Sequence, residues 1–111
     1  MIALFIVINK TELFENLIEE FHKNDIHSGT IFESLGMASI FNHDTMVGNF
    51  RGALNKFRPF NKTILMILPE DKAESAKRCV RTVIGDLDRE DVGIMFTIPV
   101  SSFEGIRGYD A

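Results

Sequence analysis

The run Gly93-Ile94-Met95-Phe96-Thr97-Ile98-Pro99-Val100 decides the fold once it is set beside three other β-rich runs of the chain. These are residues 2–8, 29–37 and 61–69. Residues 2–8 are almost wholly apolar, as expected of a central strand that is covered on at least one face. Allowing for the turn residues at their ends, we predict strands over residues 2–8, 28–34, 62–68 and 92–100.

Two amphipathic segments separate these strands. The first begins near Thr11 and is stopped by Asn24-Asp25, and the second runs from about 70 to 84, with Gly85 as residue C′. In both, apolar residues recur at helical spacing. They are Leu13, Leu17 and Phe21 in the first segment and Ala73, Ala76 and Val80 in the second.

The order of elements is therefore strand-helix-strand, a long loop, and strand-helix-strand. This is the split βαβ, or ferredoxin-like, plan of an α+β protein. It predicts an antiparallel four-stranded sheet with two helices on one face and a long loop between strands 2 and 3. The length of 111 residues fits a single domain over residues 1–111.

The loop, residues 37–60, is the irregular part of this plan. It contains Gly48, Gly52 and Pro59 and has no sustained strand pattern. A connection of about 25 residues is uncommon in a compact domain and is usually functional or mobile. Within it, apolar residues spaced at i, i+4 and i+7 predict a short helix over 50–57.

Composition excludes several classes of protein. The net charge of −4 argues against nucleic acid as a partner, because such binding depends on cationic contacts to phosphate. The single cysteine, Cys79, excludes an internal disulfide, and its helical setting predicts a small buried apolar residue. The opening apolar run is far shorter than the ~20 residues of a membrane span, and no basic segment precedes it. We therefore expect a cytoplasmic protein.

In order and spacing, these residues resemble the P-II nitrogen-regulatory family, and especially its P-II-like branch. Residues 28–37 look like the family's second strand and the root of its long T-loop. Phe50-Arg51-Gly52-Ala53 is similar to the Tyr-Arg-Gly-Ala signature of that loop, and residues 93–100 to a Gly-Lys-Ile-Phe-Val strand. The resemblance covers nearly the whole chain. It implies a homotrimer with ligands in the clefts between subunits and a T-loop, here residues 37–60, that changes shape and docks onto a target protein.

Departures from the family pattern limit the expected covalent modification and the expected class of nucleotide. Phe50 replaces a tyrosine that some members carry for nucleotidylylation, and it has no hydroxyl to modify. The phosphate-binding Gly-Asp-Gly-Lys stretch corresponds to residues 85–93, which carry four carboxylates and one arginine, and Ile94 stands in place of the lysine. A pair of arginines in the family's C-terminal loop is reduced to Arg107. An adenine nucleotide remains the expected effector, with a mono- or diphosphate favoured over ATP.

The candidate sites follow from the loop's root, its return to the sheet and the turn before the last strand. Glycines there let a ligand approach the backbone closely. The expected ligand-binding residues are Gly36, Met37, Ala38, Lys62, Thr63, Gly85, Asp86, Leu87, Gly93 and Arg107. The expected partner-binding residues of the loop are Phe41, Phe50, Arg51, Phe57 and Arg58.

Alternatives stand beside each of these interpretations. The positive charges over residues 51–62, which include no Asp or Glu, either recruit an anion or only keep a solvated loop from aggregating. The loop's aromatic residues either form a docking surface or fold back onto the trimer. Exposed acids in the turn at 86–91 either form a polar turn or select a cationic or neutral ligand.

Other site chemistries have weaker support. The spacing of Asp86, Asp88 and Glu90 is that of a calcium loop, but the glycine of the sharp turn and the distal Glu are missing. His22, His27 and His43 are expected to be too dispersed for a ligand set, so no metal site is predicted. No triad, Walker loop or pair of catalytic carboxylates is present, and we expect no enzyme.

The sequence therefore predicts a regulatory binding protein whose effector controls its affinity for a target protein. The family suggests a membrane transporter or an enzyme as the kind of target. The alternative is a structural or metal-responsive trimer like the CutA proteins, without nucleotide binding. That family shares the plan but lacks so long a loop between its second and third strands.

Overall fold

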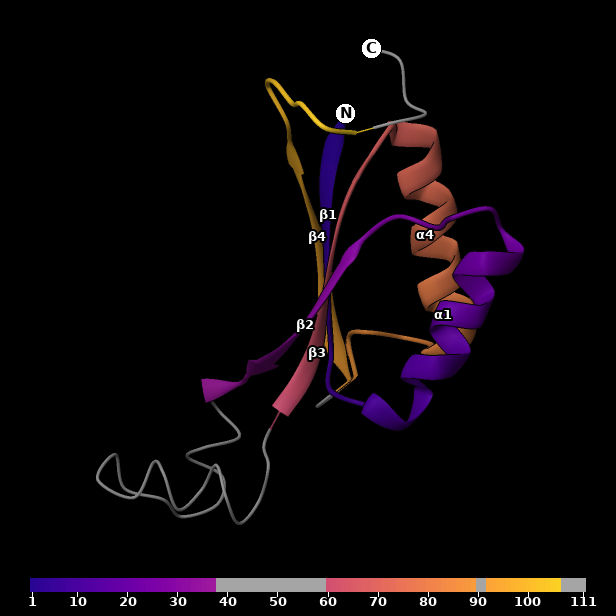
Figure 1. Ribbon diagram of the computed structural model, residues 1–111. Coiled ribbons are helices and arrows are strands. Elements are labelled where there is room, and N and C mark those ends of the chain that lie inside the picture. The colour runs from indigo at the N-terminus through magenta and orange to yellow at the C-terminus, as the bar shows by residue number, and fades with distance from the viewer. Residues whose placement is uncertain (38–59, 90–91, 107–111) are drawn as a thin grey trace.

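A computed structural model describes residues 1–37, 60–89 and 92–106 of the chain. The elements follow one another in the predicted order (Figure 1). They are β1 (Ile2–Ile8), η1 (a 3-10 helix, Thr11–Leu13), α1 (Phe14–Lys23), β2 (Thr30–Leu35), β3 (Phe60–Leu68), α4 (Glu70–Val83) and β4 (Gly93–Pro99). The ferredoxin-like plan is thus confirmed, and most predicted bounds differ from these by one or two residues.

The four strands form one antiparallel sheet in the order β2-β3-β1-β4. The apolar strand β1 is central, as its sequence predicts, and it pairs with β3 on one side and β4 on the other. Val7, for example, lies opposite Thr63 of β3 and Ile94 of β4. Side chains alternate between the two faces along each strand, so this register fixes which residues share a face.

Helices α1 and α4 cover one face of the sheet (Figure 1), and the hydrophobic core fills the space between them. Strand β1 contributes Leu4, Ile6 and Ile8, all without solvent exposure. The predicted helical stripes are buried at Leu17 and Phe21 in α1 and along the alanine-rich face of α4. Among the described residues, no helix has both the length and the apolar character needed to cross a membrane.

Both helices end in the way that their sequences predict. Gly85 follows α4 with a positive φ of 93° and donates its N–H to the carbonyl of Arg81. A glycine takes this left-handed conformation at little cost, which is why it suits the C′ position. At the end of α1 the same position is held by Asp25, whose φ is 60°.

The other face of the sheet has no helix over it among the described elements. We call it the open face. Its side chains are Ala3, Phe5 and Val7 of β1, Thr30, Phe32 and Ser34 of β2, Asn61, Thr63, Leu65 and Ile67 of β3, and Ile94, Phe96 and Ile98 of β4. Most of these are apolar, and Ile94, Phe96 and Ile98 are 58%, 43% and 47% exposed. An apolar sheet surface of this kind is normally covered by another layer.

Candidate functional site

A hollow of about 590 Å³ lies where β1 and β2 end and β3 and β4 begin. We call it the strand-end hollow. Because neighbouring strands are antiparallel, these four strand ends lie together at one end of the sheet. The hollow is lined by Val7, Asn9, Ser34, Leu35, Gly36, Met37, Asn61, Thr63, Arg89, Val92, Gly93 and Ile94.

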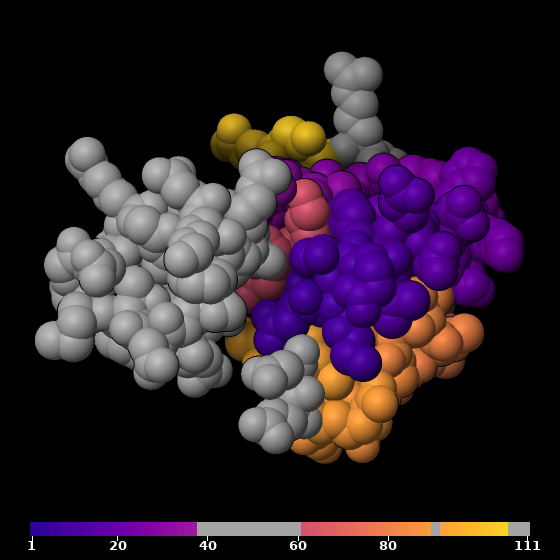
Figure 2. Space-filling model, turned by 90° about the horizontal axis from the view of Figure 1, so that it is seen from below, coloured from indigo at the N-terminus to yellow at the C-terminus, as the bar shows by residue number. Residues whose placement is uncertain are grey.

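Figure 2 views the molecule from this end. There the indigo residues of the N-terminal elements lie against orange residues of α4 and the segment that follows it. The backbone joins the same two regions, because the N–H of Asn9 donates to the carbonyl of Val92 over 3.0 Å. The end of β1 and the segment before β4 are therefore held together at the hollow.

A polar network lies within the strand-end hollow, on a face that is otherwise mostly apolar. The Ser34 hydroxyl donates to Oδ1 of Asn61 and lies 2.5 Å from the hydroxyl of Thr63. Because Ser34 has a single hydroxyl proton, Thr63 is the donor to Ser34. Nδ2 of Asn61 donates to Oδ1 of Asn9 over 3.1 Å. Asn61 and Thr63 are buried, and among the described residues no buried side-chain nitrogen or oxygen lacks a partner.

Gly93 forms the close contact between β4 and β1 in this hollow. A Cβ atom at this position would overlap the carbonyl oxygen of Val7. Gly93 pairs with Ile8, so the two backbones approach each other at the first residue of β4. A glycine is needed here because of that approach.

A second hollow of about 380 Å³ adjoins the first, and we call it the turn hollow. It is lined by Arg81, Gly85, Asp86, Leu87, Asp88, Gly93, Ile94 and Met95. Asp86 shapes the turn, because its Oδ1 accepts the N–H of Asp88 over 2.9 Å. Arg89 folds back over the same turn, where Nε donates to the carbonyl of Asp86 and Nη2 to that of Ile84. The two hollows share Gly93 and Ile94.

The charges of the two hollows differ. Arg89 is the one charged residue among the described residues that line the strand-end hollow. The turn hollow sets Arg81 against the carboxylates of Asp86 and Asp88. An anion is therefore better accommodated in the strand-end hollow, whose described lining contains Arg89 and no carboxylate. Nε and Nη2 of Arg89 already donate to carbonyls of the turn, so its remaining N–H groups are the ones available to an anion.

The structure divides the predicted ligand-binding residues between these hollows. Gly36, Met37 and Thr63 line the strand-end hollow, and Gly85, Asp86 and Leu87 line the turn hollow. Gly93 lines both. Three polar residues of the strand-end hollow, Asn9, Ser34 and Asn61, were missed by the sequence reasoning, together with Arg89. Asn61 and Thr63 alternate on one face of an otherwise apolar strand, and this pattern in the sequence could have indicated a polar site at the start of β3.

Lys62 belongs to neither lining. Its position beside Ile8 and Glu33 places it on the helix-covered side of the sheet. Its Nζ lies 2.9 Å from Oε1 of Glu33 and 5.8 Å from the centre of the Phe14 ring. Lys62 is therefore held by Glu33 and Phe14 on the helix-covered face and reaches neither hollow.

Several predictions fall outside the described residues. These are the ligand-binding residues Ala38 and Arg107, the short helix over 50–57, the loop residues Phe41, Phe50, Arg51, Phe57 and Arg58, and also His43. They stay predictions.

The expected dispersal of the histidines is wrong for one pair. His22 and His27 are in contact, with their Nδ1 atoms 3.3 Å apart. The turn that ends α1 reverses the chain and brings them together. Within residues 1–37, 60–89 and 92–106, no group of three or more His, Cys, Asp and Glu side chains is placed to hold a metal ion.

No protein-family model and no curated protein matches this sequence. A solved structure of PII from Arabidopsis thaliana, bound to citrate, is similar in fold, with a TM-score of 0.62. The similarity covers 90% of this chain and 77% of that chain, at 14% sequence identity. An identity this low carries the fold alone, and the fold of this chain is P-II-like.

Proposed function

We propose that this protein is a P-II-like signalling protein that binds a small anionic effector in the strand-end hollow. In this proposal the effector regulates a partner protein through the long segment of residues 37–60. The observation that carries the proposal is the position of the hollow. It adjoins both Gly36 and Met37, where the chain enters that segment, and the open face of the sheet.

A homotrimer is part of the proposal, and the open face supports it. Each Å² of apolar surface removed from water contributes about 25 cal/mol to association. Ile94 belongs to the open face and also lines the hollow, so a second copy on that face would lie next to a bound effector. The effector would then occupy a cleft between subunits.

The chemistry of the lining supports an anion as the effector. Arg89 offers a guanidinium, and Asn9 and Asn61 offer amide N–H groups that recognise oxygen-rich ligands. The hydroxyl protons of Ser34 and Thr63 are donated within the network and would have to turn away from it to reach a ligand. An adenine nucleotide is the leading class, with a mono- or diphosphate favoured over ATP. The similar PII protein was bound to citrate, so a polycarboxylate is the second class to test.

Regulation would depend on Gly36 and Met37, which lead from β2 into the segment of residues 38–59. An effector that contacts them can favour one arrangement of that segment over another only if it binds that arrangement more tightly. A tenfold preference supplies about 1.4 kcal/mol of bias. The target would be a protein in or at the cytoplasm, with a transporter or an enzyme as the kinds to test first. The protein's role would be regulatory rather than catalytic, and nitrogen metabolism is the first process to examine.

Calorimetry and thermal unfolding with AMP, ADP, ATP and citrate test this proposal. We expect one of these ligands to bind and to raise the melting temperature of a chain that elutes as a trimer. Arg89→Gln should weaken that binding about ten- to a hundredfold, since a hydrogen bond to a charged group contributes about 1.5–3 kcal/mol. The matched control is Arg78→Gln, because Arg78 lies on the exposed surface of α4 and contacts Ser75.

The proposal is wrong if none of these four ligands binds to a folded oligomer. It is also wrong if Arg78→Gln weakens binding as much as Arg89→Gln does. If the chain is monomeric and still binds an effector, the proposed trimer is wrong and the strand-end hollow remains the proposed site.

A further inference from the structure

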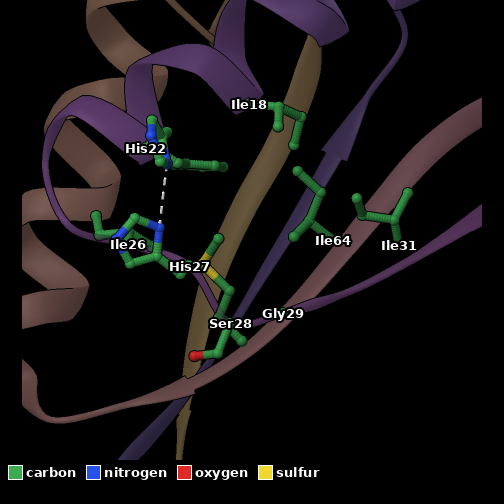
Figure 3. Close-up of a pocket in the computed structure, with 10 residues that line it drawn as sticks. Ile18, His22, Ile26, His27, Ser28, Gly29, Ile31 and Ile64 are labelled. Atoms are coloured by element: carbon green, nitrogen blue, oxygen red, sulfur yellow. Dashed lines mark hydrogen bonds between the residues drawn. The ribbon is translucent and has the colours of Figure 1, made fainter.

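A third hollow, distinct from the two above, lies on the other side of the sheet between α1 and the edge strand β2. We call it the edge hollow. It measures about 230 Å³, and its walls are mostly apolar side chains from α1, the segment after it, β2 and β3. His22 and His27 lie together beside it, and Figure 3 shows their rings across the hollow from Ile31 and Ile64. None of its lining residues belongs to the strand-end hollow.

The turn at the end of α1 fixes the relative positions of the two histidines. Asp25 adopts the left-handed conformation, its N–H donates to the carbonyl of His22, and the N–H of Ile26 donates to the carbonyl of Phe21. This pair of bonds is a Schellman motif. Ile26 and Phe21 are both buried in the core, so the motif is anchored on its inner side. His22 precedes the left-handed residue and His27 follows it.

The separation of the two rings is informative. The two Nδ1 atoms lie 3.3 Å apart, within hydrogen-bond distance, so in the metal-free chain one ring can donate to the other. Two imidazole nitrogens bound to one tetrahedral Zn²⁺ at about 2.0–2.1 Å lie roughly 3.3–3.4 Å from each other. The same spacing therefore also suits two ligands of one ion.

A carboxylate lies behind one of the rings. Oδ1 of Asp25 is 3.6 Å from Nε2 of His27, the nitrogen that faces away from His22. Histidines that bind metals usually present their second nitrogen to a carboxylate or carbonyl, which orients the ring and raises its basicity. At 3.6 Å the pair lies within ion-pair distance but is longer than a hydrogen bond, so Asp25 would orient His27 after a small rotation of either side chain.

We propose that His22 and His27 bind a divalent transition-metal ion through their Nδ1 atoms, with water completing the coordination. Imidazole ligands suit Zn²⁺, Cu²⁺ and Ni²⁺, and Zn²⁺ fits the spacing. Both rings are exposed, so an ion has access to them. Asp25 acts as a positioning residue. The site is independent of the proposed effector site.

NMR of the imidazole ring protons during a titration with Zn²⁺ locates the ion directly. The protein should be the full chain without a histidine tag. We expect the ring signals of His22 and His27 to shift together and to saturate at one ion per chain, while those of His43 stay in place. A titration in which both signals stay unchanged up to about a millimolar Zn²⁺, or in which only His43 responds, overturns the proposal.

Substitutions of single histidines distinguish Zn²⁺ binding by the pair from non-specific Zn²⁺ binding to any histidine of the chain. Calorimetry with Zn²⁺ should show no binding to His22→Ala or to His27→Ala and unchanged binding to the matched control His43→Ala. Asp25→Asn should keep the turn, because Asn tolerates its conformation, and should weaken Zn²⁺ binding about tenfold through the loss of the carboxylate. Unchanged Zn²⁺ binding in the double variant of His22 and His27, with its fold verified by circular dichroism, rejects the site.

Discussion

The rings of Phe5 and Phe96 stack across the β1–β4 ladder, with their centroids 4.9 Å apart and their planes inclined by 7°. The two residues are directly paired in the sheet, and both belong to the open face. Stacked aromatic pairs contribute about 0.5–1.5 kcal/mol beyond the area that they bury. The centre of the open face is therefore ordered before any second copy of the chain covers it.

A charge introduced into this face should separate the subunits. Phe96→Glu removes the stacked pair and places a carboxylate on the surface that the proposed trimer buries, where desolvation of a charge is costly. We expect a monomer in light scattering coupled to size-exclusion chromatography. Thr97→Glu is the matched control, because Thr97 is exposed on the opposite face of the same strand. Loss of the trimer in both variants would contradict an interface on the open face.

Gly93 should resist substitution. In Gly93→Ala the new Cβ overlaps the carbonyl oxygen of Val7, so the β1–β4 contact must open. We expect the free energy of unfolding in urea to fall by about 1–3 kcal/mol, the usual cost of forcing extra atoms into a packed site. The control is Gly105→Ala, where no described atom beyond the chain neighbours lies within 4 Å of the added Cβ, so only the strain of a φ of 82° remains. An unfolding free energy equal to that of the unmodified chain would show that the strands do not meet as described.

Replacing Asp25 with glycine should stabilise the folded chain. Its φ of 60° strains an L-residue, whereas glycine adopts this conformation freely at a C′ position. We expect Asp25→Gly to raise the free energy of unfolding by up to about 1 kcal/mol in metal-free buffer. The same replacement in the first turn of α4, Asp71→Gly, should lower it, because glycine disfavours a helix and the carboxylate at the N-terminus is lost. A lower unfolding free energy for Asp25→Gly would contradict the described turn.

Cys79 should be chemically inert in the folded chain. Burial raises the pKa of its thiol, and the negative charge of Glu20 adds to the effect. At neutral pH the group therefore stays protonated, and the thiolate is the reactive form. We expect a colorimetric thiol reagent to react far more slowly with the native chain than with the chain in concentrated urea. Equal rates in the two conditions would mean that the α1–α4 contact opens readily.

The fold could be predicted because its signals are local. The continuous apolar run of β1, the helical spacing of Leu17 and Phe21, and Gly85 after α4 each specify structure within a few residues. The extra turn of 3-10 helix at Thr11–Leu13 and the early start of β3 at Phe60 shift boundaries without changing the plan.

The candidate site was only partly predictable because it depends on register between distant strands. Lys62 and Thr63 are neighbours in sequence, yet they point to opposite faces, and only Thr63 reaches the strand-end hollow. The contacts among Ser34, Asn61 and Asn9 join three strand ends that are far apart along the chain. The contact between His22 and His27 depends on the backbone conformation of a single aspartate between them.

Gly93 and Ile94 border the strand-end hollow and the turn hollow alike. Because Gly93 carries no side chain, it contributes only main-chain atoms to the two hollows. A ligand in one hollow would therefore contact the same two residues as a ligand in the other, and the two ligands would compete through Gly93 and Ile94.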